Sequence, residues 1–404
     1  MKKKVLVFIE DGTFTCDNRV IQETSALIQE GWEVTVISPK GSNDPLYRKV
    51  SEKLRAYYFP KPTAKGAFGH IIEHSISLMF GIFLTLWVFL RHGFSVFHAC
   101  NPMDILWIIA IPYKFLGVKF IYDQHDLCPE IFISRGNGDV TSLIYKILLI
   151  NEKISYRIAD CVISTNESYK EIAINRGGKN PSDVFVVRNG PDLDQFKPTT
   201  PDPTIKKRGK IIVGYLGNMN IQDGVDYLIE AANEIINNRK RSDISFVLIG
   251  SGSVQEILAR RVTDLGIEEN VLFTGRMAPD REMMAVLSAC DICVQPDPPN
   301  PLNDKSTMCK AMEYMALKKP LIAFDLKETR VTCGDVALYV LENSPIALAD
   351  KILELADAPD MRTMMGEKGR QRIELFYTWS HSVPNLIGAY KHLKFSTPEW
   401  VKSG

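Results

Sequence analysis

A polar loop followed by one carboxylate, at residues 303–316, carries side chains that bind anions and hydroxyl groups. Lys305, Ser306 and Thr307 precede a predicted helix, and Glu313 lies two turns inside it. The opening of a helix presents free N–H groups and partial positive charge, which suit a phosphate. Glu313 would repel an anion, but it can accept hydrogen bonds from hydroxyls such as those of a ribose. This spacing indicates a nucleotide-sugar site; the alternative is an ordinary amphipathic helix with a surface Glu.

The sequence shows two series of alternating strand and helix signals, and these predicted elements must position the loop at residues 303–316. Short apolar strands separated by helices predict parallel sheets covered on both faces. Residues 198–210, rich in Pro, Thr and charge, read as a linker. The predicted domains are 1–197 and 211–378, with a helical tail at 379–404. The predicted strands are Val5–Ile9, Glu33–Ser38, Val96–Ala99, Lys119–Tyr122, Cys161–Ser164 and Val184–Val187, then Ile211–Leu216, Phe246–Ile249, Val271–Thr274, Ile292–Gln295 and Leu321–Phe324.

Ligands of open parallel sheets bind at the carboxyl ends of the strands. Three of the five ends in the second series carry glycine, which lets a ligand approach the backbone closely. These glycines are Gly217, Gly250 with Gly252, and Gly275. Each alone would usually be a turn residue, but together they predict one crevice beside Glu313. No Gly-x-Gly-x-x-Gly follows the first strand, which disfavours a nicotinamide enzyme.

Composition sets further bounds. The 404 residues are 45% hydrophobic and 24% charged, with 48 basic and 48 acidic side chains, as in a two-domain globular protein. The balanced charge gives no reason to expect nucleic acid as a partner. The eight cysteines are scattered apart from the pair Cys290 and Cys293, so we predict no metal site and a reducing, cytoplasmic compartment.

The apolar stretch Ile76–Leu90 lies between two strand signals, where a crossover helix is required. Its 15 residues are fewer than the roughly 20 that cross a bilayer. Three interpretations remain: a buried crossover helix, one that also touches a membrane surface, or a membrane span. The second would place the protein at the inner face of the membrane.

The loop and helix at 303–316, with the strand that follows, resemble the donor-site motif of the retaining GT-B glycosyltransferases of family 4. That family fold is two Rossmann-like parallel-sheet domains facing each other across a cleft, and the resemblance covers nearly the whole chain. Its Glu-x7-Glu motif ends at Glu313, and its first Glu falls on Lys305. The resemblance implies the following donor-binding residues: Gly217, Asn218, Gly250, Gly252, Arg276, Met277, Lys305, Ser306, Thr307, Met308 and Glu313.

The chain departs from the family at the diphosphate. The family places an Arg and a Lys on the first glycine loop, and Asn218 and Asp223 stand there in this sequence. Losing two cations is a large electrostatic change, and Asp223 would repel the phosphates if it lay close. Lys305 is the natural replacement, and Arg276 and Lys310 are weaker candidates.

The first domain supplies the other predicted residues. His125 and Asp126 resemble the family's His-Asp loop, in which the His points at the donor sugar and the acceptor, so we predict catalytic roles for them beside Lys305. A structural histidine is the alternative. Gly12 and Thr13 stand where the family keeps its acceptor loop, and Arg19 could face an acidic acceptor group or be a helix-surface residue.

The resemblance implies retaining transfer of a sugar from a nucleotide diphosphate sugar, with a UDP-sugar as the favoured donor and no metal or other cofactor. The acceptor expected is a hydroxyl of a glycan, lipid-linked, in bacterial surface polysaccharide synthesis. A nucleotide-sugar epimerase of the same fold, or a relative that binds nucleotide sugar without catalysis, remains an alternative.

Overall fold

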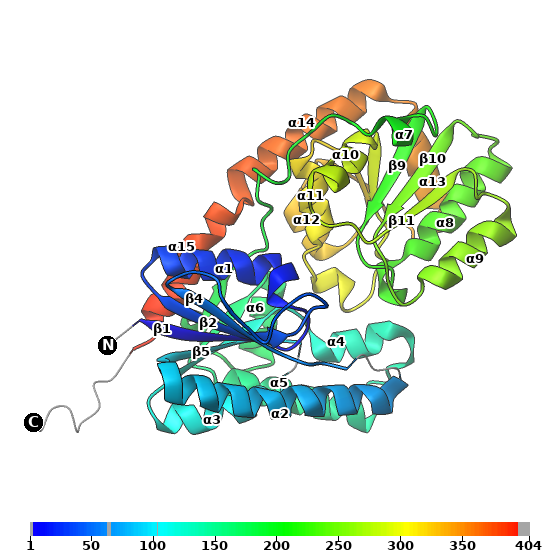
Figure 1. The fold of residues 1–404 in the computed structure, drawn as a ribbon. Coiled ribbons are helices and arrows are strands. Elements are labelled where there is room, and N and C mark those ends of the chain that lie inside the picture. Colours follow the sequence, from blue (N-terminus) through cyan, green and yellow to red (C-terminus); the bar gives the residue numbers. More distant parts are fainter. Residues whose placement is uncertain (1–2, 63–65, 103, 395–404) are drawn as a thin grey trace, which may run out of the picture. The chain divides into compact units, whose positions relative to one another are not determined.

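The computed structural model describes residues 3–62, 66–102 and 104–394. The chain divides into two compact α/β units (Figure 1). The first unit contains Met1–Phe132, Gly138–Asn189 and Ser382–Gly404, and the second contains Ile133–Asn137 and Gly190–His381. The first unit is therefore built from segments that lie before and after the second in the sequence.

The first unit is built around an eight-stranded sheet in the order β3-β4-β2-β1-β5-β6-β7-β8. Every neighbouring pair is parallel except β3 with β4, which is antiparallel. β3 and β4 were not predicted, and they form one edge of the sheet. The strands are β1 (Lys4–Ile9), β2 (Glu33–Pro39), β3 (Tyr47–Lys49), β4 (Leu54–Phe59), β5 (Val96–Cys100), β6 (Lys119–Gln124), β7 (Cys161–Ser164) and β8 (Val184–Val186).

Helices cover both faces of this sheet. Figure 1 shows α2, α3 and α5 together on one side of the sheet, and α1 and α15 on the other. Trp32, just after α1, packs edge-on against Tyr390 of α15, with ring centroids 4.9 Å apart. The helices are α1 (Asn18–Gln29), α2 (Gly66–His92), α3 (Trp107–Phe115), α4 (Cys128–Phe132), α5 (Leu143–Ile158), α6 (Glu167–Asn175) and α15 (Trp379–His392).

The crossover helix between β4 and β5 is α2, and at 27 residues it is longer than the predicted segment 76–90. Among the described residues, Ile72–His92 forms the one helix that is long and apolar enough to cross a membrane by length and composition alone. Val88 is nevertheless fully buried in the first unit's core, and Phe80 stacks on Phe59 of β4. α2 is thus packed along the sheet.

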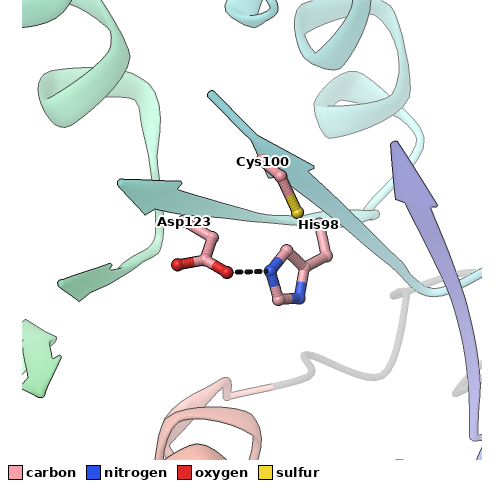
Figure 2. Close-up of side chains that lie close together, drawn as sticks. All are labelled: His98, Cys100 and Asp123. Carbon is pink, nitrogen blue, oxygen red and sulfur yellow. Dashed lines mark hydrogen bonds and ion pairs between the residues drawn. The ribbon is translucent and has the colours of Figure 1, made fainter. Parts of the chain in front are cut away.

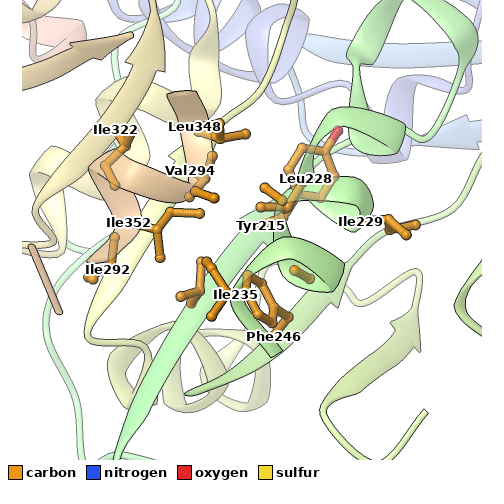
Figure 3. Packing of buried hydrophobic residues seen from close by; sticks show 14 of the residues in the cluster. Tyr215, Leu228, Ile229, Ile235, Phe246, Ile292, Val294, Ile322, Leu348 and Ile352 are labelled. Atoms are coloured by element: carbon orange, nitrogen blue, oxygen red, sulfur yellow. The ribbon is translucent and has the colours of Figure 1, made fainter. Parts of the chain in front are cut away.

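The second unit has a six-stranded, wholly parallel sheet in the order β11-β10-β9-β12-β13-β14. One face of it carries a large apolar core in which Phe246 and Ile292 from the strands meet Leu228 of α8 and Ile352 of α13 (Figure 3). The strands are β9 (Ile211–Leu216), β10 (Ile244–Ile249), β11 (Val271–Gly275), β12 (Ile292–Gln295), β13 (Leu321–Phe324) and β14 (Ala337–Val340). The helices are α7 (Pro203–Lys206), α8 (Val225–Asn233), α9 (Gln255–Leu265), α10 (Arg281–Ala289), α11 (Cys309–Ala316), α12 (Lys327–Cys333), α13 (Pro345–Ala356) and α14 (Pro359–Phe376).

The predicted linker, 198–210, lies inside the second unit. It contains α7, whose Asp202 cap accepts hydrogen bonds from Thr204 and Ile205 backbone N–H groups. Ile205 is buried in the unit's second core cluster. The units divide between Asn189 and Gly190, ahead of the predicted boundary at residue 197.

Candidate functional site

The second sheet reverses its strand order between β9 and β12, and that is where open parallel sheets bind ligands. Gly217 follows β9, and Asp297 follows β12 by two residues. Both strand ends are joined by Tyr314 of α11, whose hydroxyl accepts a hydrogen bond from Leu216 N at 2.6 Å and donates toward Val294 O at 3.4 Å. Tyr314 therefore fixes α11 over the switch point, a role that the sequence pattern did not reveal.

The glycines after β9 and β10 allow the loops that follow these two strands to pack closely against each other. A Cβ atom on Gly250 would lie 1.8 Å from Gly217 O, and one on Gly252 would lie 2.2 Å from Met219 O. Asn220 ties the same loops, because its Oδ1 accepts hydrogen bonds from the Ser253 backbone at 3.1 Å and hydroxyl at 2.9 Å. Gly250 and Gly252 are thus required by loop contact, whereas the sequence analysis assigned them to ligand approach.

A buried ion pair lies under the Gly217 loop. Lys310 Nζ is 3.0 Å from Oδ1 and 2.9 Å from Oδ2 of Asp297, and both side chains are almost wholly buried. The ammonium lies 5.0 Å from the ring centroid of Tyr215, and a Cβ on Gly217 would be 3.1 Å from Lys310 Cε. Burial disfavours the charged ammonium, but Asp297 outweighs it and raises the pKa of Lys310. The switch point therefore contains one permanent cation.

Glu313 is half-buried, one turn C-terminal to the start of α11. α11 begins at Cys309, with Met308 as its N-cap residue, so the predicted position two turns inside the helix is corrected to one. Burial raises the pKa of Glu313 to about 7, and the nearby Lys310 opposes that shift. A carboxylate that titrates near neutrality is poised to change its charge when hydroxyl groups hydrogen-bond to it.

Ser306 and Thr307 precede α11, which begins two residues after Thr307. Asn303–Lys305 is a short 3-10 turn, and residues 306–308 lead from it to α11. Lys305 Nζ donates to Pro301 O at 3.0 Å, and Ser306 Oγ donates to Leu302 O at 2.8 Å. Ser306, Thr307 and Met308 are half-buried ahead of the helix.

The carboxylate of Asp223, in the loop after β9, is held by a hydrogen bond within that loop. Its Oδ2 accepts a hydrogen bond from Asn220 N at 2.8 Å and so caps the short turn at Ile221–Asp223. Burial raises the pKa of Asp223, while Lys310 opposes that effect. Asn218 is exposed and its carbonyl accepts a hydrogen bond from the Tyr215 hydroxyl. After β11, Arg276 is exposed, and Met277 packs against the second core cluster.

In the first unit, the loop after β6 is held by Asn101, which follows β5. Asn101 Oδ1 accepts hydrogen bonds from His125 N at 2.7 Å and Asp126 N at 2.9 Å. Its Nδ2 donates to Asp126 O at 2.7 Å. Asn101 is buried, so these hydrogen bonds fix both predicted catalytic residues of this unit. The sequence analysis missed Asn101; its place at a strand's carboxyl end was the available signal.

The imidazole of His125 lies in a buried charge network. Its Nε2 is 2.8 Å from Asp123 Oδ2 and 3.0 Å from Arg19 Nε, and one nitrogen cannot serve both as donor and as acceptor. Burial disfavours the imidazolium, but Asp123 outweighs it and raises the pKa of His125. Nε2 is therefore the donor to Asp123, and Arg19 Nε pairs instead with Glu23 at 3.1 Å. Among the described residues, His125 Nδ1 has no hydrogen-bond partner.

Arg19 belongs to the same network. Its Nη2 donates to Asp123 Oδ1 at 2.9 Å, and its Nη1 donates to Val187 O at 2.7 Å and to Asn189 Oδ1 at 2.9 Å. The side chain is 3% exposed, so it positions Asp123 from inside the unit. This arrangement gives no support to the predicted role of Arg19 toward an acceptor, and it also excludes a helix-surface position. Thr13 donates to Asp44 Oδ2 at 2.6 Å, beside the exposed Gly12.

His98, Cys100 and Asp123 bring a nitrogen, a sulfur and an oxygen within 4.8 Å of one another (Figure 2). Such a donor set can suit a transition metal. Here the Asp123 carboxylate is already paired with Arg19 and with His98 Nε2 at 3.1 Å, and His98 Nδ1 is 2.7 Å from the Tyr390 hydroxyl. Burial raises the pKa of the Cys100 thiol well above its usual range. The three residues therefore fit a hydrogen-bonded charge network better than a metal site.

Two parallel α/β units, each with polar residues at the carboxyl ends of the strands beside its switch point, define the GT-B class. Comparison with known families agrees. Residues 18–195 match the family model described as Glycosyltransferase Family 4, and residues 210–358 match the model described as Glycosyl transferases group 1. The chain belongs to the family-4 glycosyltransferases of the GT-B fold.

Solved structures share this fold. A sucrose-phosphate synthase from Thermosynechococcus elongatus aligns over all of both chains with a TM-score of 0.77 and 18% identity. HepE from Anabaena in complex with UDP-glucose aligns over 96% of this chain and 100% of that chain, with a TM-score of 0.71 and 14% identity. At these identities the likeness shows the fold alone.

Among curated proteins, a D-inositol 3-phosphate glycosyltransferase from Gordonia bronchialis is 28% identical over 68% of this chain and 61% of its own length. A GDP-mannose-dependent monoacylated alpha-(1-6)-phosphatidylinositol monomannoside mannosyltransferase from Corynebacterium glutamicum is 28% identical over 47% of this chain and 51% of its own length. The chain thus spans about half to six-tenths of these relatives.

Proposed function

We propose that the protein is a retaining glycosyltransferase. It moves a sugar from a nucleotide diphosphate sugar, with a UDP-sugar favoured, to a hydroxyl of a lipid-linked glycan in polysaccharide synthesis. The observation that carries the proposal is that α11 brings a buried cation, Lys310, and a half-buried carboxylate, Glu313, close together at the switch point of the second sheet, with Asp297 as the ion-pair partner of Lys310. The location proposed is the cytoplasm, at the inner face of the membrane.

The charges of the side chains at the proposed site determine the roles assigned to them. Glu313 accepts hydrogen bonds from the ribose hydroxyls, which favour its ionised form. Lys310 and Lys305, together with the free N–H groups at the start of α11, stabilise the negative charge that grows on the departing diphosphate. This arrangement requires no metal ion. His125 acts on the transferred sugar, and its Nδ1 is the nitrogen available for that task.

The names of the relatives support the acceptor and donor classes. The two curated relatives are named for transfer to an inositol phosphate and to a phosphatidylinositol mannoside, and one neighbour was solved with UDP-glucose. Phosphorylated or lipid-linked polyols are therefore the first acceptors to try. GDP-mannose is the first donor to compare with UDP-sugars.

A second candidate is a relative that binds nucleotide sugar without transferring it. It is favoured by Asn218 and Asp223, which stand where the family has cations. The buried Lys310 answers part of that objection, since it places an ammonium group beneath the same loop, with Asp297 as its counter-ion.

The test begins with thermal unfolding in the presence of UDP-glucose, UDP-N-acetylglucosamine and GDP-mannose. A donor that binds the native state raises the melting temperature, and the stabilisation grows with the logarithm of one plus its concentration divided by Kd. That donor is then incubated with and without a lipid-linked polyol phosphate. Product formed only with the acceptor supports the transferase, release of an epimerised sugar from donor alone supports the epimerase, and binding without turnover supports the non-catalytic relative.

A further inference from the structure

The crossover helix α2 faces the sheet with its small side. Ser77, Gly81 and Thr85 are buried at four-residue spacing, and Val88 continues the same side. A Cβ atom added to Gly81 would lie 2.8 Å from Ile109 Cδ1 of α3, so this side is packed tightly. A helix on the surface of a water-soluble domain normally buries its large apolar residues and exposes its polar ones. α2 departs from this rule, because it buries Ser77 and Thr85 and exposes several large apolar residues.

The outward side of α2 consists of large apolar residues. Phe83 is 66% exposed and Trp87 is 54% exposed. Leu78, Phe80 and Phe89 are partly buried against the core. The exposed set is Ile72, Met79, Ile82, Phe83, Leu86, Trp87 and Leu90.

This apolar surface continues across two neighbouring helices that sequence reasoning did not implicate. α3 ends in Phe115, which is 87% exposed, and α5 begins with Leu143, which is 72% exposed. The three helices lie together on one side of the sheet (Figure 1), and Trp107 Nε1 of α3 donates to Asn151 Oδ1 of α5 at 3.3 Å. We call the outward side of α2, α3 and α5 the apolar face; it adds Ile108, Phe115, Leu116, Leu143, Ile144, Ile147 and Ile150 to the α2 residues.

The fully exposed charges of the apolar face all have one sign. Arg91 at the end of α2 and Lys146, Lys153 and Arg157 along α5 are exposed cations. The three helices contain two carboxylates in all, and neither faces outward. Glu73 is ion-paired with Lys61 at 3.1 Å, and the buried Glu152 is paired with Arg176 at 2.6 Å. The whole chain has a net charge of zero, so this positive surface is a local feature.

We propose that the apolar face seats the first unit on the surface of an anionic phospholipid bilayer. Phe83, Trp87 and the apolar start of α5 enter the boundary between headgroups and acyl chains, and Lys146, Lys153 and Arg157 meet lipid phosphates. The proposal deepens the proposed function, because a lipid-linked acceptor has to be met at such a surface. The docking itself follows from exposure and charge, whatever reaction the protein performs.

Two other occupants are disfavoured by the same observations. A membrane span would require α2 to leave the sheet against which Ser77, Gly81, Thr85 and Val88 are buried. A second copy of this chain on the apolar face would bring the cations of α5 toward those of its partner, and the two carboxylates of these helices are already paired with Lys61 and Arg176. Like charges brought together in this way cost free energy.

The polar end of α2 also reaches the predicted acceptor loop. His74 Nδ1 lies 3.1 Å from Oε1 of the buried Glu10, the residue that follows β1. Lys61 Nζ is 3.1 Å from the same Glu10 oxygen and 3.1 Å from Glu73 Oε1. Gly12 and Thr13 follow two and three residues after Glu10. The helix that would lie on the lipid is therefore ion-paired with the strand end that leads into the acceptor loop.

The experiment is flotation of the full chain with vesicles of phosphatidylcholine alone or of phosphatidylcholine mixed with phosphatidylglycerol. We expect the parent to float with the mixed vesicles at low salt, and less at high salt, because screening weakens the cationic contribution. Leu143→Ser/Ile147→Ser and Phe83→Ser/Trp87→Ser should each lower the bound fraction by about tenfold or more, since each removes two large apolar groups from the face. Lys146→Glu/Lys153→Glu should abolish the preference for anionic vesicles.

The matched controls are Ile257→Ser/Ile346→Ser, two exposed apolar residues of the second unit, and the exposed Arg260→Glu. These variants should float like the parent, and all variants should melt near the parental temperature because the altered side chains are exposed. Absence of flotation at low salt, or flotation unchanged by the α2 and α5 variants, overturns the proposal. So does a dimer in sedimentation that the same variants dissociate.

The proposed function and the docking of the apolar face on a membrane can be contradicted independently. Flotation without any nucleotide-sugar binding would contradict the proposed function and leave the docking surface intact. Nucleotide-sugar binding and transfer to a soluble acceptor, without flotation, would support the proposed function and contradict the docking surface.

Discussion

Lys310 Nζ lies 2.9 Å from Oδ2 of Asp297, and this buried pair holds a cation under the first glycine loop of the second unit. The family's cations would stand on that loop, at Asn218 and Asp223. Here the positive charge comes from α11, below the loop, and its position is fixed by a carboxylate. Lys305, the replacement expected from sequence, donates a hydrogen bond to Pro301 O.

Lys310→Met should weaken both folding and donor binding. Removing one partner of a buried ion pair leaves the other charge uncompensated and costs about 3–5 kcal/mol of unfolding free energy. Lys310→Met/Asp297→Leu removes both charges and should recover most of that stability, but not the donor affinity. Urea denaturation and donor titration of the two variants separate the effects. Parental donor affinity in the double variant would contradict a phosphate role for Lys310.

Glu313→Gln should lower donor affinity by about tenfold or more with folding intact, because hydrogen bonds to charged groups contribute roughly 1.5–3 kcal/mol. The pKa of Glu313 is raised to about 7, so the ionised carboxylate is lost as pH falls through that value. Parental donor affinity should therefore rise from about pH 6 to about pH 8, and the Gln variant should lose that rise. Isothermal titration at several pH values measures both, and a pH-independent parent would remove the ribose assignment.

The raised pKa of Glu313 affects stability and donor affinity in opposite directions as the pH changes. Ionising Glu313 is harder in the folded than in the unfolded state, so its contribution to stability is greatest below the unfolded pKa and falls as pH rises toward about 7. Without donor, Glu313→Gln should be more stable than the parent above neutral pH and no more stable in acid. Denaturation curves at both ends of the range test this, and a Gln variant less stable at high pH contradicts it.

Lys305→Ala should reduce turnover more than it reduces binding of a nucleoside monophosphate, because leaving-group charge builds on the second phosphate. Lys305→Glu restores the residue that the family has at this position. Steady-state kinetics with the donor identified by thermal shift compare the three proteins. If Lys305→Glu is as active as the parent, Lys305 does not supply the diphosphate charge.

His125→Ala should cut sugar transfer by about a hundredfold or more, the usual scale for a positioned acid–base or hydroxyl-binding group. The affinity for nucleoside diphosphate should hardly change, because His125 belongs to the first unit. Transfer kinetics and nucleotide titration give the two readouts. Full activity, or a variant that no longer folds, would favour a structural histidine.

Asn101→Ala should reduce transfer without direct contact with substrate. It removes the acceptor for the backbone N–H groups of His125 and Asp126, so the loop after β6 loses its fixed position. Asn101→Asp keeps that acceptor but replaces Nδ2, which donates to Asp104 Oδ1 at 3.0 Å and to Asp126 O at 2.7 Å, with a second oxygen, so it should also lose stability. Thermal unfolding measured beside transfer kinetics separates the two effects, and parental transfer by Asn101→Ala would show that Asn101 does not position His125.

The pattern of apolar residues along the sequence was enough to predict most strands of the two sheets. β1, β2 and β9 fall within one residue of the predicted strands, because their apolar runs are bounded by turn residues. β3 was missed since Tyr47–Lys49 is short and exposed at the edge of the sheet, and β4 was missed since Arg55 and two Tyr residues interrupt its apolar pattern. Sequence periodicity marks neither kind of strand clearly.

The site was predicted less well than the fold. Glu313 was predicted from residue type and spacing, and it does lie at the switch point. Lys310 was ranked below Lys305 because only the packed structure shows that Asp297 holds it there. Asn101 and Tyr314 act through backbone hydrogen bonds between elements distant in sequence, which no local motif encodes.

The hydrogen bond between His98 and Tyr390 has a consequence for biosynthesis. Tyr390 lies on α15, past the whole of the second unit, and packs on Trp32 as well. The ribosome therefore releases the first unit's strands long before the helix that covers them, while the second unit emerges in one nearly continuous stretch. The unit whose strands are made first is therefore the unit whose last segment is made last.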